Sequence, residues 1–135
     1  MSEATIASAV SHDDLVERIA EKAFDSRLFM IYTNTKRAQR RGVKGRYPHL
    51  VAVGKVSQQV EMVGMVETAD SLHDLAAAAR RWRTLEPLQA AMYLYVPRGY
   101  CADARALCLR ERLRISDFRH YWIDEAGLHV EKCFA

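Results

Sequence analysis

A run of cationic side chains is the first feature of this sequence with a clear chemical use. Six basic residues and no acidic residue fall within the eleven positions from 36 to 46: Lys36, Arg37, Arg40, Arg41, Lys44 and Arg46. A local basic run of this kind can meet the phosphates of a nucleic acid. Gly42, Gly45 and the lack of an apolar period predict a loop over residues 35–47. Mutual repulsion predicts that this loop stays open unless an anion binds.

His49 follows the run and directly precedes an apolar segment. An imidazole can hold a transition metal or act as a base, although a histidine at a strand start is more often hydrogen-bonded or exposed. The other histidines show no ligand spacing: His12, His73, His120 and His129. The sequence contains no Gly-rich phosphate loop, nucleophile elbow or dinucleotide fingerprint.

The composition is typical of one small soluble domain. The chain has 135 residues, of which 50% are hydrophobic and 27% charged, with a net charge of +3. No window approaches the roughly 18 apolar residues of a membrane span. The first ten residues lack a basic start, so we expect a flexible tail there rather than a signal peptide. The cysteine count is odd and no C-x-x-C occurs, so we expect reduced thiols at Cys101, Cys108 and Cys133 and a cytoplasmic location.

Apolar periodicity predicts an α/β fold, a mixed sheet flanked by helices. Ser11 and Asp14 form a variant of the capping box, which Ser71 and Asp74 repeat. The predicted elements are a helix over 11–27, strands over 28–33, 50–56 and 60–67, a helix over 71–85, a strand over 91–96, a helix over 102–113, and a closing hairpin or ragged ends over 118–123 and 128–133. The segments 50–56 and 60–67 should pair as antiparallel strands. Trp82 should be buried against the sheet, and Arg80, Arg81 and Arg83 should lie on the exposed side of their helix.

This element order, αβββαβα(β), resembles that of the PD-(D/E)XK superfamily of restriction-endonuclease-like nucleases. Two segments carry most of the likeness, Tyr47-Pro48-His49-Leu50-Val51-Ala52-Val53 and Val63-Gly64-Met65-Val66-Glu67-Thr68-Ala69-Asp70-Ser71-Leu72. The resemblance covers residues 14–123 and implies metal-dependent phosphodiester hydrolysis. In that family an aspartate after a proline and a Glu-x-Lys or Glu-x-Glu pair on the next strand hold a divalent metal and activate water.

The resemblance also implies that the metal site is degenerate in this chain. His49 stands where the family has its aspartate, Met65 stands at the first position of the paired motif, and only the last position keeps an acid, Glu67. A thioether is a soft ligand and does not replace a carboxylate for Mg²⁺. Glu17 or Glu21 of the entry helix could supply the additional ligand that some family members use. Glu67 also fits a purely structural position, as an acid beside a helix start.

Together these observations predict a non-catalytic, nuclease-like module that binds nucleic acid or takes part in another interaction. One alternative is an active nuclease using Glu67 and His49 with manganese or another transition metal. Another is a protein-interaction domain without a nucleic-acid partner. We expect no cofactor, with Mg²⁺ or Mn²⁺ only under the first alternative. DNA or RNA would bind through the 36–46 loop, and no membrane partner is expected. We expect a homodimer only because two-fold dimers are common, since no motif indicates one.

Overall fold

A computed structural model describes residues 10–135, so the tail predicted over residues 1–10 lies almost entirely outside the described residues. The elements follow in the order α2 (His12–Ala23), β1 (Phe29–Thr33), β2 (Leu50–Gly54), β3 (Val60–Val66), α3 (Leu75–Arg83), the 3₁₀ turn η1 (Glu86–Leu88), β4 (Ala91–Pro97), α4 (Cys101–Glu111), β5 (Asp117–Asp124) and β6 (Gly127–Lys132). Within this range no helix is long and apolar enough to span a membrane.

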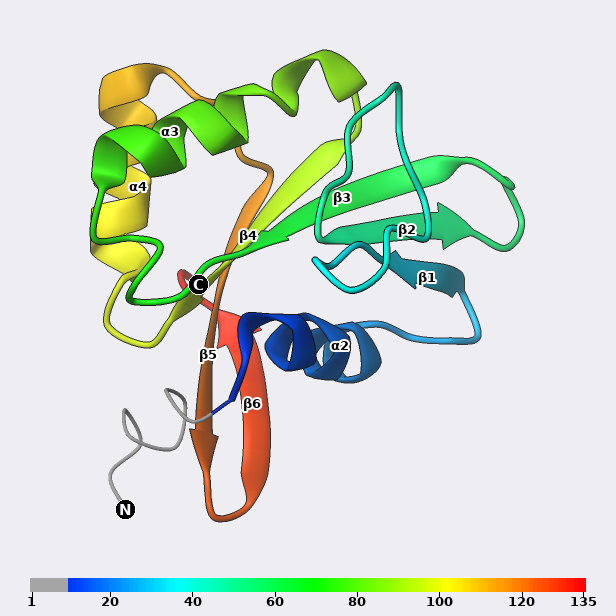
Figure 1. The fold of residues 1–135 in the computed structure, drawn as a ribbon, viewed down its shortest axis with the longest axis horizontal. Helices are drawn as coiled ribbons and strands as arrows, with labels where there is room; N and C mark the ends of the chain where they lie inside the picture. Colours follow the sequence, from blue (N-terminus) through cyan, green and yellow to red (C-terminus); the bar gives the residue numbers. More distant parts are fainter. Residues whose placement is uncertain (1–9) are drawn as a thin grey trace.

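The strands form one six-stranded mixed sheet in the order β1-β2-β3-β4-β5-β6. Strands β1, β2 and β3 form an antiparallel meander, β3, β4 and β5 run parallel, and β6 closes an antiparallel hairpin with β5. Helices α3 and α4 connect the parallel strands and lie together on one face, whereas α2 lies on the other (Figure 1). The α/β class and the mixed sheet are therefore as predicted.

The sheet is curled around α2. This helix contacts both edge strands, β1 and β6, which a flat six-stranded sheet would hold roughly 24 Å apart. A helix with its side chains is only about 10 Å wide, so the sheet must bend for both edges to reach it. Leu15, Val16 and Ile19 of α2 fill the resulting concave face against Leu50 and Val66.

Alternation along the strands divides the core between the two faces. Val63 and Met65 of β3 face the layer of α3 and α4, where Trp82 is fully buried. The intervening Gly64 lies under Leu50 and Tyr95 on the α2 side. The predicted antiparallel pairing of 50–56 with 60–67, the burial of Trp82 and the closing hairpin are confirmed.

Two predicted helix boundaries were wrong. Helix α2 begins as expected, with the Ser11 hydroxyl accepting from the Asp14 N–H at 3.1 Å, but it ends at Ala23. Helix α3 begins at Leu75, four residues after Ser71, because Asp74 provides the cap and accepts from the Ala77 N–H at 3.0 Å. The hydroxyl of Ser71 is instead hydrogen-bonded to Glu67. A capping-box pattern identifies compatible residues, and long-range partners decide which one caps.

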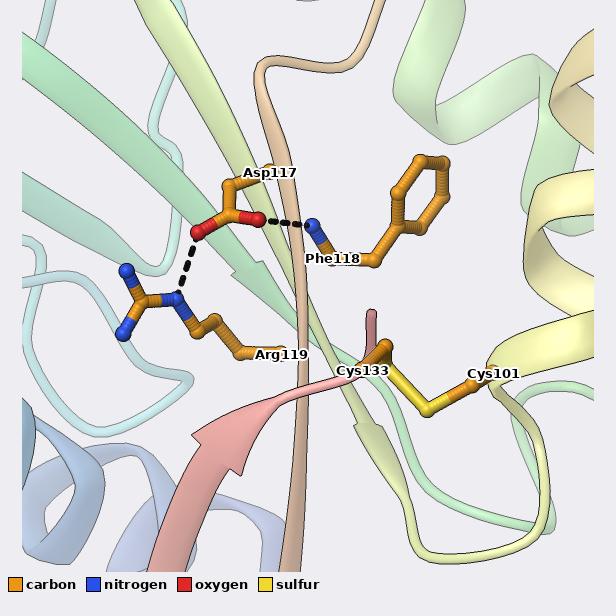
Figure 2. The surroundings of a disulfide bond; sticks show 5 residues. All are labelled: Cys101, Asp117, Phe118, Arg119 and Cys133. Carbon is orange, nitrogen blue, oxygen red and sulfur yellow. Dashed lines mark hydrogen bonds and ion pairs between the residues drawn. A yellow bond between two sulfur atoms is a disulfide. The ribbon is translucent and has the colours of Figure 1, made fainter. Parts of the chain in front are cut away.

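The prediction of three reduced thiols was also wrong. Cys101, the first residue of α4, forms a disulfide with Cys133, just beyond β6, and the two Cα atoms are 5.6 Å apart (Figure 2). Cys133 also donates its backbone N–H to Phe118 of β5 at 2.8 Å. Only Cys108 is a free thiol, and burial raises its pKa to about 12. The disulfide ties the end of the chain to the start of α4.

Candidate functional site

His49 lies at the entry to β2 with one ring nitrogen already engaged. Its Nδ1 accepts a hydrogen bond from the backbone N–H of Val66 at 2.9 Å, so the neutral ring carries its proton on Nε2. Burial, followed by the neighbouring His12, lowers the pKa of His49 to about 4. The imidazole is therefore neutral at physiological pH with a defined tautomer. Its Nδ1 lone pair is occupied, and binding a metal through Nε2 would turn an Nδ1 proton towards the Val66 N–H.

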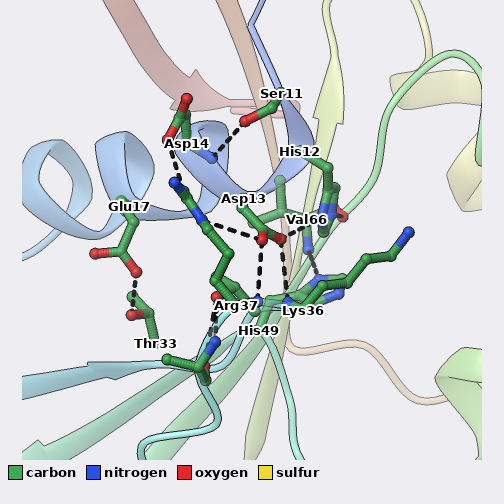
Figure 3. Close-up of polar contacts among 12 residues, drawn as sticks. Ser11, His12, Asp13, Asp14, Glu17, Thr33, Lys36, Arg37, His49 and Val66 are labelled. Atoms are coloured by element: carbon green, nitrogen blue, oxygen red, sulfur yellow. Dashed lines mark hydrogen bonds and ion pairs between the residues drawn. The ribbon is translucent and has the colours of Figure 1, made fainter.

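A second histidine meets His49 at this point. His12 is the first residue of α2, its Nε2 lies 2.9 Å from the carbonyl oxygen of Val66, and its ring contacts that of His49 edge to face at 4.6 Å (Figure 3). The two imidazoles thus bind the N–H and the C=O of one residue. Sequence spacing did not reveal this pair, because the start of a helix and the start of a strand are brought together only by the curl of the sheet.

Glu67, directly after β3, is 1% exposed, and all the donors to its carboxylate come from α3 and the turn before it. Its Oε1 accepts from the Trp82 indole N–H at 2.8 Å. Its Oε2 accepts from the Arg81 guanidinium at 2.9 Å and from the Ser71 hydroxyl at 2.5 Å. Arg81 was expected on the exposed side of the helix, but a buried carboxylate needs a cation and draws it inward.

The backbone of Glu67 is also engaged on both sides. Its N–H donates to the Tyr95 carbonyl at 2.8 Å, and its C=O accepts from the Tyr121 hydroxyl at 2.8 Å. Burial raises the pKa of Tyr121, which keeps that phenol a donor. Glu67 therefore links α3, β4 and β5, and both of its carboxylate oxygens are occupied by protein donors.

The remaining positions of the family pattern do not converge on Glu67. Met65 is buried in the core beneath α3 and α4. Glu17 accepts from Thr33 and forms an ion pair with Arg40, and Glu21 is exposed on α2. Across residues 10–135, no group of three or more His, Cys, Asp or Glu side chains is arranged to hold a metal ion.

Acidic residues of α2 hold the first part of the 36–46 loop. Asp13 accepts from the backbone N–H groups of Lys36 and Arg37, each at 3.2 Å, and also pairs with the Arg37 guanidinium at 3.3 Å (Figure 3). Burial alone would raise the pKa of Asp13, but the backbone hydrogen bonds from Lys36 and Arg37, together with the neighbouring positive charges, lower that pKa. Asp14 pairs with Arg37 at 2.6 Å, and Arg40 pairs with Glu17 at 2.8 Å.

The prediction that repulsion keeps the whole loop open was therefore wrong for Arg37 and Arg40. Their acidic partners lie more than twenty positions earlier in the sequence, on one face of a helix that packs beside the loop. A scan for acids within the run itself does not find them.

The other four cations of the loop form no ion pair with any residue in the described part of the chain. Lys36, Lys44 and Arg46 are exposed, and the Arg41 guanidinium lies 5.4 Å from the centre of the Tyr32 ring. Lys44 and Gly45 both have positive φ, and Val43 and Arg46 close the turn with reciprocal backbone bonds at 2.8 and 2.9 Å. This turn presents Lys44 at its tip.

A polar pocket of about 220 Å³ lies between this loop and the histidine pair. It is lined by His12, Asn34, Thr35, Lys36, Gln39, Tyr47 and His49. Asn34 holds the rim by donating to the carbonyls of Arg41 and Pro48, each at 2.7 Å. Tyr47 is 48% exposed. The loop, this pocket and the entry to β2 thus form one continuous region of the surface.

Comparison of the chain with known proteins found no match. No protein-family model matches the chain, and neither a curated protein nor a solved structure matches it.

Proposed function

We propose that this chain is a nucleic-acid-binding module of restriction-endonuclease-like fold that has lost the PD-(D/E)XK metal site. The observation that carries the proposal is a set of four cations on the 36–46 loop that form no ion pair with any of residues 10–135, beside the half-exposed ring of Tyr47. Cations that are not neutralised by a neighbouring acid are available to phosphates. An exposed aromatic ring adds a face on which a base can stack.

The chemistry at His49 and Glu67 supports a non-catalytic role. A metal-activating site needs carboxylate oxygens and nitrogen lone pairs that are free to coordinate. Here the Nδ1 of His49 accepts from Val66, and both oxygens of Glu67 accept from Ser71, Arg81 and Trp82. Each group stabilises the fold through these bonds.

We therefore expect no Mg²⁺- or Mn²⁺-dependent cleavage of labelled DNA or RNA by the purified protein. A suitable control is His49→Asn, whose amide oxygen can still accept from the Val66 N–H. Metal-dependent cleavage that co-elutes with the protein and disappears in His49→Asn would contradict this expectation and favour the active-nuclease alternative. Introducing acids at both His49 and Met65 would not rebuild the site, because Met65 lies in the apolar core.

Binding to duplex DNA should weaken steeply with salt. If the four unpaired cations each meet one phosphate, the log–log slope of affinity against salt should be about −3.6, and Arg41→Ala, Lys44→Ala and Arg46→Ala together should reduce it to about −0.9. Base sequence should have little effect, because contacts to phosphate position the partner without reading bases. Fluorescence anisotropy across a salt series measures the slope.

A matched control removes the same charge elsewhere. The exposed residues Lys22, Lys55 and Lys132 can be changed to Ala together, and this variant should retain the wild-type slope. Equal slopes in the two triple variants would assign binding to net charge rather than to the loop. No affinity for any nucleic acid at low salt would refute the proposal and favour a protein-interaction domain.

A further inference from the structure

The polar pocket beside the histidine pair is suited to an anion. None of its seven lining residues is acidic, and one of them, Lys36, is a cation that forms no ion pair with any described residue. The Asp13 carboxylate lies close by, 4.0 Å from Nδ1 of His12. It accepts from the backbone N–H groups of Lys36 and Arg37 and pairs with the Arg37 guanidinium, and these contacts offset its charge (Figure 3). The Lys36 ammonium is therefore available to an anion in the pocket.

His49 presents a fixed hydrogen-bond donor to this pocket. Its Nδ1 accepts from the Val66 N–H, so the proton of the neutral ring is on Nε2. That N–H donates to no described residue, and among those residues every fully buried side-chain nitrogen or oxygen has a partner. The Nε2–H group must therefore reach accessible surface, and the pocket is the surface that His49 lines. Because burial lowers the pKa of His49 to about 4, this donor is present and uncharged at physiological pH.

A closed turn over residues 34–39 places two more donors beside the same space. A bridge joins Asn34 to Gln39 at the two ends of this turn. The Lys36 ammonium and the Gln39 amide both line the pocket from it. Neither side chain is hydrogen-bonded to another residue in the described part of the chain. Together with the Nε2–H group of His49, the pocket thus has three donor groups, which come from two separate segments.

Three donor groups match the three terminal oxygens of a phosphate monoester. A monoester carries about −1.5 to −2 charges at pH 7, whereas each phosphodiester within a strand carries a single charge. Hydrogen bonds to such charged oxygens are roughly twice as strong as bonds between neutral groups. The end of a strand also has a terminal base with one unstacked face, and Tyr47 on the pocket lining is 48% exposed and offers a ring for it. The pocket therefore favours a phosphorylated end over the middle of a strand.

We propose that this pocket binds the terminal phosphate of a nucleic-acid strand, with Lys36 and His49 on the phosphate oxygens and the terminal base against Tyr47. Lys36 belongs both to the pocket and to the 36–46 loop, so the other cations of the loop meet the phosphates that follow the end. The inference rests on the proposed nucleic-acid binding, and it adds that the protein recognises the end of the strand by its phosphate.

A labelled DNA hairpin with one blunt end tests this preference, prepared with a 5′-phosphate, with a 3′-phosphate or with hydroxyl groups only. By fluorescence anisotropy, one phosphorylated hairpin should have a dissociation constant at least about tenfold lower than the hydroxyl hairpin, as expected from one hydrogen bond to a charged group. Lys36→Ala and His49→Asn should each reduce this ratio to about threefold or less. In His49→Asn the amide oxygen can still accept from the Val66 N–H while the Nε2 donor is lost, and a melting curve checks that the fold is kept.

Lys44→Ala is the matched control for Lys36→Ala. It removes one cation from the tip of the same loop, outside the pocket lining, so it should weaken the binding of all three hairpins alike and keep the wild-type ratio. A preference that survives in both Lys36→Ala and His49→Asn overturns the proposal, because the phosphate then binds elsewhere. A preference that Lys44→Ala reduces as much as Lys36→Ala does overturns it as well.

The outcomes also separate this inference from the proposed function. Equal affinity for the phosphorylated and hydroxyl hairpins, with the steep salt dependence intact, overturns the pocket assignment and leaves binding by the loop. No affinity for any hairpin overturns both. Calorimetric titration with adenosine monophosphate is the remaining measurement, and it should show far weaker binding than the phosphorylated hairpin. Equal affinity would assign the pocket to a small phosphate monoester and overturn the strand-end proposal.

Discussion

Replacing Glu67 with Ala should lower the free energy of unfolding by about 2–4 kcal/mol, because it removes charge-assisted hydrogen bonds and leaves one buried donor without an acceptor. The carboxylate is 1% exposed, and its loss leaves the Trp82 indole N–H buried without an acceptor. Arg81 is less affected, because its side chain is 37% exposed and can turn to water. For a domain of this size the melting temperature should fall by about 10–15 °C. Urea denaturation followed by circular dichroism measures the change.

Two variants distinguish the loss of the buried hydrogen bonds of Glu67 from the loss of a carboxylate in general. Glu131→Ala removes an exposed strand carboxylate and should change stability by less than about 0.5 kcal/mol. Trp82→Phe keeps most of the buried ring but deletes the donor to Oε1, and it should cost about 1–3 kcal/mol. If Glu67→Ala costs less than Trp82→Phe, the carboxylate is not the centre of this network.

Breaking the disulfide between Cys101 and Cys133 should cost about 3.7 kcal/mol, the loop-closure value for a separation of 32 residues. The cross-link lowers the conformational entropy of the unfolded chain over the segment that forms α4, β5 and β6. Cys133→Ala should therefore melt well below the wild type. Thermal denaturation with and without dithiothreitol measures the effect.

The reductant provides an internal control for the disulfide. Dithiothreitol should lower the melting temperature of the wild type to that of Cys133→Ala and should leave the variant unchanged. Peptide mapping without reduction should recover residues 101 and 133 in one linked species, with the buried Cys108 unmodified. A wild type whose melting does not respond to reductant would contradict the pairing.

Local sequence predicted the element order well. The apolar run from Leu50 and the segment from Val60 pair as expected, and Trp82 is buried at its predicted helical spacing. These features depend on periods of about two and 3.6 residues, which each segment carries by itself. The cap at Ser11 is likewise a contact within one turn.

The hydrogen-bonding state of the candidate site residues was not predictable in the same way. The sequence identified Glu67 and His49, but their partners lie on other elements, so their free or occupied state could not be read from spacing. Helix α3 begins late for the same reason, because Ser71 bonds to a carboxylate that only the packed structure buries beside it.

By itself the sequence determined which segments become strands and helices, where the apolar faces lie, and that a dense cationic run precedes β2. Only the tertiary structure decided which of those cations are neutralised: Asp13, Asp14 and Glu17 bind Arg37 and Arg40 because the curled sheet brings α2 beside the loop. It also decided that Cys101 meets Cys133. Secondary structure is set by contacts within a few residues, whereas charge pairing and disulfides depend on contacts between distant segments, which exist only after the sheet has closed around its helix.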